Sequence, residues 1–188
     1  MYTINLCSAL STPFVRFSTT IGEQRVSDMN MQNASTRFEV IEAFHRFFLD
    51  VDTRDWSHLR DVLTDEVTAD YTELWGGEVK PQTKDTLVES WRHTLSGFQA
   101  TQHLLGNEIV SLDGETALLR AYFQARHALP NERGSHLWTV GGRYTARLVH
   151  RERGWLLNEL TLHFSWADGN LNLFELATQR TQTHISAS

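Results

Sequence analysis

The chain has 188 residues and a formal net charge of -6, and 40% of its residues are hydrophobic, which is ordinary for one globular domain. This acidic balance, without a local cluster of Lys and Arg, argues against nucleic acid as a partner. No apolar run approaches the ~20 residues that a membrane span needs, and the single cysteine, Cys7, cannot form an internal disulfide. We therefore expect a soluble cytoplasmic protein that has no membrane partner.

The chain is predicted to consist of three segments that differ in composition and apolar periodicity. Residues 1–34 are rich in Ser and Thr and show neither apolar periodicity nor the apolar segment of a secretory signal, so we expect a flexible N-terminal extension there. One domain is expected over residues 35–175, followed by a C-terminal tail over 176–188. Apolar residues near that tail, such as Leu173 and Phe174, could form one more packed turn.

Three helices are predicted before residue 100. The spacing Thr36-Arg-Phe-Glu39 is that of a capping box, and apolar residues then recur at three- and four-residue intervals to about Leu49. Asp55 is a suitable N-cap for a second, shorter helix, and a third helix is predicted from about Thr83 to Leu95. The apolar stripe of the first helix comprises Phe38, Ile41, Phe44, Phe47 and Phe48.

Strands carry most of the remaining sequence. A short strand is expected over 67–71, and from residue 100 the apolar period changes from 3.6 to 2. Asp113-Gly114 is a strong hairpin signal between the first two long strands. The inward faces of the last three strands are predicted to be Ala117, Leu119, Ala121, Phe123, Ala125 and His127; then Trp138, Val140, Gly142, Tyr144, Ala146 and Leu148; and finally Leu156, Leu160, Leu162, Phe164 and Trp166.

This order of elements predicts the α+β fold class. We expect a cone-shaped barrel in which a strongly curved antiparallel sheet is packed by three N-terminal helices. Helices on one side of a bent sheet would enclose a pocket that is open at one end. The tryptophans Trp75, Trp91, Trp155 and Trp166 are expected in the core.

Several short motifs resemble one known family. They are Asp52-Thr-Arg-Asp55-Trp56, Asp70-Tyr71, Gly76-Gly77, the string Ala100-Thr-Gln-His103-Leu-Leu-Gly-Asn107, and Gly154-Trp155. Over roughly residues 36–172 they are similar to the nuclear-transport-factor-2-like superfamily, and within it to the SnoaL-like branch that includes scytalone dehydratase. The resemblance implies the cone-shaped fold, whose pocket serves several enzymes and also members that catalyse nothing.

The resemblance also implies roles for individual residues. It places a carboxylate at Asp52 hydrogen-bonded to the imidazole of His103, a second imidazole at His127, and at Tyr71 a phenol that helps to hold water against a substrate carbonyl. A second tyrosine of the dehydratase pattern falls at Val51, and its serine and asparagine fall at Tyr144 and Ala146. These departures make scytalone itself a doubtful substrate, while a related proton transfer stays possible.

Such residues could perform acid/base chemistry without a cofactor. An imidazole that donates to a carboxylate has a fixed tautomer and a raised basicity, so His103 could take an α-proton and return it to a leaving oxygen. Tyr71 would polarise the carbonyl as an enolate forms. A dehydratase-type lyase or an isomerase for a hydrophobic cyclic or polyketide-like substrate follows. The expected substrate-binding residues are Phe123, Trp138, Val140, Tyr144 and Val51.

Other interpretations remain open from the sequence. Asp52 and His103 could be a purely structural pair, and His127 could lie at a rim. Two histidines and an aspartate could also form a metal triad, but their spacing contains no tight metal motif, so no metal is expected. A non-catalytic ligand-binding or protein-binding member of the superfamily is the alternative function. Arg143, Arg147 and Arg151 on the outer sheet face suggest a solvated or subunit-facing stripe, and we expect a homodimer or homotrimer.

Overall fold

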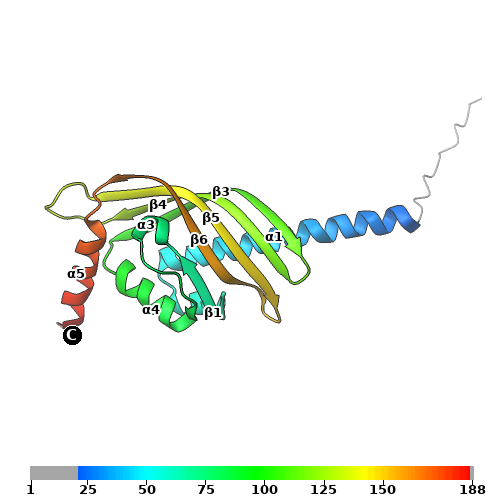
Figure 1. Ribbon diagram of the computed structural model, residues 1–188, viewed down its shortest axis with the longest axis horizontal. Helices are drawn as coiled ribbons and strands as arrows, with labels where there is room; N and C mark the ends of the chain where they lie inside the picture. Colours follow the sequence, from blue (N-terminus) through cyan, green and yellow to red (C-terminus); the bar gives the residue numbers. More distant parts are fainter. Residues whose placement is uncertain (1–20, 187–188) are drawn as a thin grey trace, which may run out of the picture. The chain divides into compact units, whose positions relative to one another are not determined.

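The computed structural model describes residues 21–186 (Figure 1). The chain divides into two compact units, residues 1–34 and 35–188, and helix α1 (Ile21–Thr53) begins in the first unit. Residues 21–34 are therefore helical. The sequence pattern did not indicate a helix there, because this stretch carries no apolar stripe. Residues 1–20 lie outside the described part of the chain. The second unit contains the whole α+β domain.

Local sequence explains where the helices of the domain begin. Asp55 caps α2 by accepting a hydrogen bond from the backbone N–H of His58 at 3.0 Å, and Thr83 caps α4 through the N–H of Thr86 at 3.2 Å, as the sequence predicted. The short α3, which the sequence did not indicate, begins directly after Tyr71. Helices α2 to α5 are Trp56–Asp61, Thr72–Trp75, Lys84–Leu95 and Leu173–Ser186.

One curved sheet of six strands forms the other layer (Figure 1). Its order is β2-β1-β6-β5-β4-β3, and every neighbouring pair is antiparallel except β1 and β6, which run parallel. The sheet is therefore mixed and open, whereas the sequence predicted antiparallel pairing throughout. The strands β1 to β6 are Leu63–Asp70, Gln82–Thr83, Ala100–Asp113, Thr116–Ala128, Leu137–Arg151 and Gly154–Gly169.

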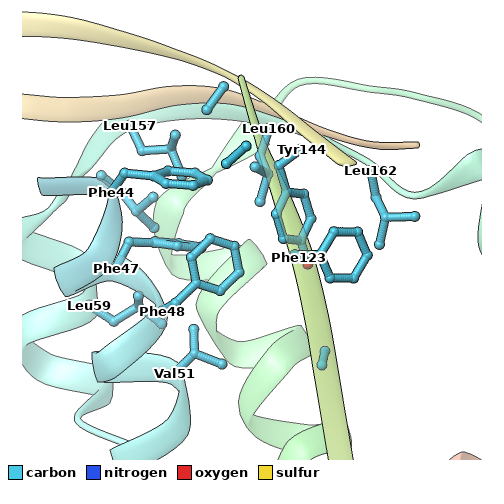
Figure 2. Close-up of a cluster of buried hydrophobic side chains, with 14 of the residues drawn as sticks. Phe44, Phe47, Phe48, Val51, Leu59, Phe123, Tyr144, Leu157, Leu160 and Leu162 are labelled. Carbon is cyan, nitrogen blue, oxygen red and sulfur yellow. The ribbon is translucent and has the colours of Figure 1, made fainter. Parts of the chain in front are cut away.

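The core lies between helix α1 and the inner face of the sheet. Phe44 and Phe47 are at most 1% exposed, and the Phe48 ring meets each of theirs edge to face at 5.1 and 4.8 Å (Figure 2). The period-two face of β4 from Ala117 to His127 is buried as predicted. Phe38, by contrast, is 66% exposed, so its assignment to the apolar stripe was wrong.

The end of β6 departs from the predicted inward face. Leu160 and Leu162 are buried, but Phe164 is 40% exposed and Trp166 is 44% exposed. A bulge turns Trp166 to the outer face, because Gly142 pairs with Phe164 while its neighbour Gly141 pairs with Trp166; Phe164 itself precedes the bulge. Trp75, also expected in the core, is 53% exposed, whereas Trp155 is buried and Trp91 is partly buried.

Helix α5 packs tightly against the turn that precedes β3. A Cβ atom at Gly97 would lie 1.9 Å from the carbonyl oxygen of Ala177, so a glycine is required at this contact. Leu173 and Ala177 are fully buried. We expected a tail beyond residue 175, and the structure has helix α5 continuing there to Ser186.

Strand β3 forms one edge of the sheet. Its register shifts between Gly106 and Ile109, where Asn107 has a φ of 56°. The guanidinium of Arg37 on α1 donates to the carbonyl oxygen of Val110 at 2.8 Å. Helix α1 thus supplies a partner to the free side of this strand.

Among the described residues, no helix combines the length and the apolar character needed to cross a membrane.

Candidate active site

A cavity of about 420 Å³ opens between α1, α4 and the inner face of the sheet. Its wall is completed by α3 and by Phe174 of α5. Among the described residues, no Lys, Arg, Asp or Glu lines it. The lining residues are Phe47, Phe48, Val51, Tyr71, Leu74, Trp75, Ser90, Trp91, Thr94, Leu95, His103, Ala125, His127, Trp138, Val140, Tyr144, Leu162 and Phe174.

The side chain of Asp52 joins the last turn of α1 to the start of β3. Its Oδ1 atom lies 2.8 Å from Nδ1 of His103 and accepts a hydrogen bond from the Thr101 hydroxyl at 2.9 Å. Its Oδ2 atom accepts from the backbone N–H of His103 at 2.7 Å. One carboxylate therefore fixes both the backbone and the ring of His103. The structure brings together the two residues that the family motifs paired.

The charge state of Asp52 determines which nitrogen of His103 is basic. Burial by itself would raise the pKa of Asp52, but the hydrogen bonds from His103 and Thr101 outweigh it and hold the pKa below its usual range. The carboxylate is thus ionised and can only accept, so the neutral His103 ring carries its proton on Nδ1. Nε2 then keeps its lone pair, and no described residue forms a hydrogen bond with it.

His127 is the second imidazole of the cavity. Its ring centroid lies 6.3 Å from that of His103, and the rings of Phe98, Trp138 and Phe174 surround it at 4.9 to 5.1 Å. Burial, and secondarily the neighbouring His103, lower the pKa of His127 to about 3, so this ring is neutral at physiological pH. Its Nδ1 atom is buried and has no hydrogen-bond partner among the described residues.

Tyr71 reaches the cavity from the junction between β1 and α3. The preceding Asp70 accepts hydrogen bonds from the backbone N–H and the hydroxyl of Thr72, at 2.9 and 2.7 Å, which fixes the chain at this junction. Burial raises the pKa of Tyr71, so its phenol stays protonated and can donate a hydrogen bond.

The predicted substrate-binding residues differ in how they meet the cavity. Val51, Trp138, Val140 and Tyr144 line it directly. Phe123 is not among the lining residues and instead stacks on the Tyr144 ring at 4.1 Å.

Sequence reasoning missed several aromatic rings at the cavity, among them those of Trp75 and Phe174. Trp75 was assigned to the core and Phe174 to the end of the domain, yet the two rings lie 4.9 Å apart in the cavity wall. The spacing of Leu173, Phe174 and Ala177 is helical and was the available signal for the second ring. Within residues 21–186, no group of three His, Cys, Asp or Glu side chains is placed to hold a metal ion.

The fold agrees with the comparison to known families. Residues 32–161 match the SnoaL-like domain, and the chain belongs to that family. Its fold is that of the nuclear-transport-factor-2-like proteins, as the sequence motifs indicated. No curated protein matches the chain.

Three solved structures illustrate the relationship. The Kfla4162 protein from Kribbella flavida is 28% identical, with a TM-score of 0.71 over 77% of this chain and 98% of that protein. A proposed scytalone dehydratase from Novosphingobium aromaticivorans is 15% identical, with a TM-score of 0.61 over 77% of this chain and 91% of its own. Hexachlorocyclohexane dehydrochlorinase LinA-type3 from Novosphingobium barchaimii is 10% identical, with a TM-score of 0.63 over 76% and 94%.

Proposed function

We propose that this SnoaL-like protein is a cofactor-independent lyase of the dehydratase type, or an isomerase, that acts on a hydrophobic cyclic or polyketide-like compound. The observation that carries the proposal is the His103 imidazole, which lines an apolar cavity while Asp52 holds its Nδ1 at 2.8 Å. A histidine held in this way has one nitrogen available as a base and a partner that stabilises its protonated form.

The proposed reaction begins at a C–H bond next to a carbonyl. Nε2 of His103 takes the proton, the electron pair moves into an enolate, and Tyr71 donates a hydrogen bond to the enolate oxygen, directly or through water. The enolate then expels a β-hydroxyl group, which receives the same proton from the imidazolium and leaves as water. In an isomerisation the proton would return to another carbon of the substrate. Neutral His127 would hold a substrate hydroxyl.

Two of the structural neighbours have names that describe eliminations. A dehydratase removes water and a dehydrochlorinase removes hydrogen chloride. Both reactions need a base beside a C–H bond and a leaving group on the next carbon. At 15% and 10% identity they share the fold, and the base in this chain is proposed from its own geometry.

The test is a screen of cyclic β-hydroxyketones for loss of water, followed by mass spectrometry. We expect the wild type to convert at least one compound and His103→Gln to do so about 100-fold or more slowly, because the base is lost. His45→Gln is the matched control, since His45 bonds Glu108 at 2.8 Å and does not line the cavity. Equal turnover by His103→Gln contradicts the proposal. A compound that binds without any turnover supports the alternative, a ligand-binding member.

We also propose that the protein forms a homodimer or homotrimer through the outer face of the sheet. Arg143 and Arg147 lie on that face, together with the half-exposed rings of Tyr122 and Trp166. Light scattering during size-exclusion chromatography measures the mass directly. A monomer at micromolar concentration would contradict this part of the proposal.

A further inference from the structure

The cavity wall offers hydrogen bonds but no charge. Its polar side chains are two imidazoles, two phenols, the hydroxyls of Ser90 and Thr94 and the indoles of Trp75, Trp91 and Trp138, and none of the described lining residues is Lys, Arg, Asp or Glu. A charged ligand would lose its hydration in such a cavity without gaining an ionic partner, which strongly disfavours its binding. The Asp52 carboxylate behind His103 would further repel an anion.

Tyr144 on β5 is a polar group of this wall whose ring is held on several sides. The residue is 2% exposed, and its ring lies between Phe123, stacked at 4.1 Å, and Phe48, stacked at 4.9 Å (Figure 2). A third ring, that of Phe44, meets it edge to face at 6.2 Å. Three aromatic contacts therefore fix the direction in which the phenol points.

The hydroxyl of Tyr144 makes no hydrogen bond with the described residues, and it is not one of the solvent-excluded polar atoms that lack a partner, so it is open to the cavity that Tyr144 lines. Polar groups in an apolar wall are normally paired with protein, water or a ligand, because an unpaired group is destabilising. Burial, together with the nearby Tyr71 and Asp52, raises the pKa of Tyr144 well above its usual range, so the group remains a neutral donor. An aligned donor without a protein partner at a cavity wall is suited to a ligand.

We propose that the Tyr144 hydroxyl is a specificity-determining donor that binds an uncharged carbonyl or hydroxyl oxygen of the substrate, and that the cavity selects neutral oxygenated ring compounds over their carboxylate or phosphate analogues. This inference rests on the proposed function for its setting. It concerns binding, however, and can be tested without turnover. Tyr71, at the junction of β1 and α3, would bind the same oxygen or an adjacent one.

The test uses three bicyclic probes of similar shape, namely 1-tetralone, the hydrocarbon tetralin and the anion 1-naphthoate. Calorimetry measures affinity, and the ¹³C shift of carbonyl-labelled 1-tetralone reports a hydrogen bond to its oxygen. For the wild type we expect tetralone to bind, its carbonyl resonance to move downfield, and naphthoate to bind at least about 100-fold more weakly. Tyr144→Phe should weaken tetralone about 3- to 10-fold and remove most of the downfield shift.

Two controls separate this inference from its neighbours. Tetralin should bind wild type and Tyr144→Phe equally, because the substitution keeps the ring stack and removes one hydroxyl. His103→Gln should retain the tetralone shift even though it is expected to lose catalysis, so a failure of the catalytic proposal leaves this readout intact. Unchanged tetralone binding and shift in Tyr144→Phe, naphthoate binding as tight as tetralone, or no binding of tetralone to the wild type would each overturn the inference. Loss of the thermal transition in Tyr144→Phe would also overturn it, since it would assign the hydroxyl to folding.

Discussion

The Asp52 carboxylate is hydrogen-bonded to both the backbone N–H and the ring of His103, although 51 positions separate the two residues in the chain. The Oδ1 and Oδ2 atoms of Asp52 both accept hydrogen bonds. An N–H group in the place of either oxygen would therefore face another donor. The pair therefore fixes the tautomer of the ring as well as its place in the cavity. The first prediction follows from this arrangement.

In Asp52→Asn, an N–H of the new amide must face a donor whichever way the amide turns, unless His103 moves its proton to Nε2. We expect that shift of tautomer, which removes the base from the cavity and lowers kcat/KM about 10²- to 10⁴-fold on any substrate found. ¹⁵N NMR of the imidazole detects the tautomer without a substrate. A ring that keeps its proton on Nδ1 in the variant, with full activity, would contradict the assigned role of Asp52.

Thr101→Val removes the hydroxyl that donates to Asp52 Oδ1 at 2.9 Å. We expect the free energy of unfolding to fall by about 1 kcal/mol and the pKa of Asp52 to rise. The folded-state pKa of Asp52 is lowered, so its contribution to stability is present above pH 3.8 and is lost as the pH falls through the folded value. In the variant this contribution becomes smaller. Urea titrations should therefore show a larger fall in the free energy of unfolding for Thr101→Val than for the control Thr161→Val. Thr161 is a partly buried threonine on the same sheet.

His127 should make the fold sensitive to mild acid. Its imidazole has a pKa of about 3 when folded against 6.5 as a free side chain, so between these values the unfolded chain binds more protons. The free energy of unfolding thus rises with pH over this window and is fully present above pH 6.5. From pH 7 to pH 5 we expect a loss of about 2 kcal/mol. His127→Phe should abolish most of this loss, while the same change at the exposed His136 should leave it in place. Identical slopes in the two variants would contradict the assignment.

Gly97→Ala should loosen helix α5. The added Cβ would lie 1.9 Å from the Ala177 carbonyl oxygen, and we expect a destabilisation of about 1–3 kcal/mol with faster hydrogen exchange in Leu173–Ser186. Gly106→Ala is the matched control, because its Cβ would meet nothing within 4 Å. Neither glycine has a positive φ, so the comparison isolates the steric effect. Equal stabilities would show that α5 can shift to accommodate the methyl group.

The sequence predicted those parts of the fold that obey a local period. The faces of β4 and β5 and the helix from Lys84 to Leu95 lie where the spacing put them, because alternation and three- to four-residue repeats follow directly from backbone geometry. Trp166 was misplaced because a bulge after Phe164 reverses the faces of β6, and no residue type indicates a bulge. The parallel pairing of β1 with β6 is equally non-local.

The candidate site was predictable for a different reason. Asp52 and His103 were paired through family motifs, since nothing in the local sequence of a helix end and a strand indicates that they meet. Trp75 and Phe174 lie in segments of only a few apolar residues, where periodicity says little about burial. The support that Phe123 gives to Tyr144 depends on cross-strand stacking and became visible only in three dimensions.

The edge of the sheet at β3 has a consequence for how chains meet. A free strand of 14 residues presents unpaired backbone groups that could template a strand from another molecule, the first step toward aggregation. The shift in register after Gly106 interrupts this row of backbone groups. The Arg37 guanidinium also donates a hydrogen bond to the Val110 carbonyl oxygen at 2.8 Å. The edge is therefore unsuited to intermolecular strand addition, so the β3–β4 hairpin can lie at the margin of the sheet without recruiting a strand from another molecule.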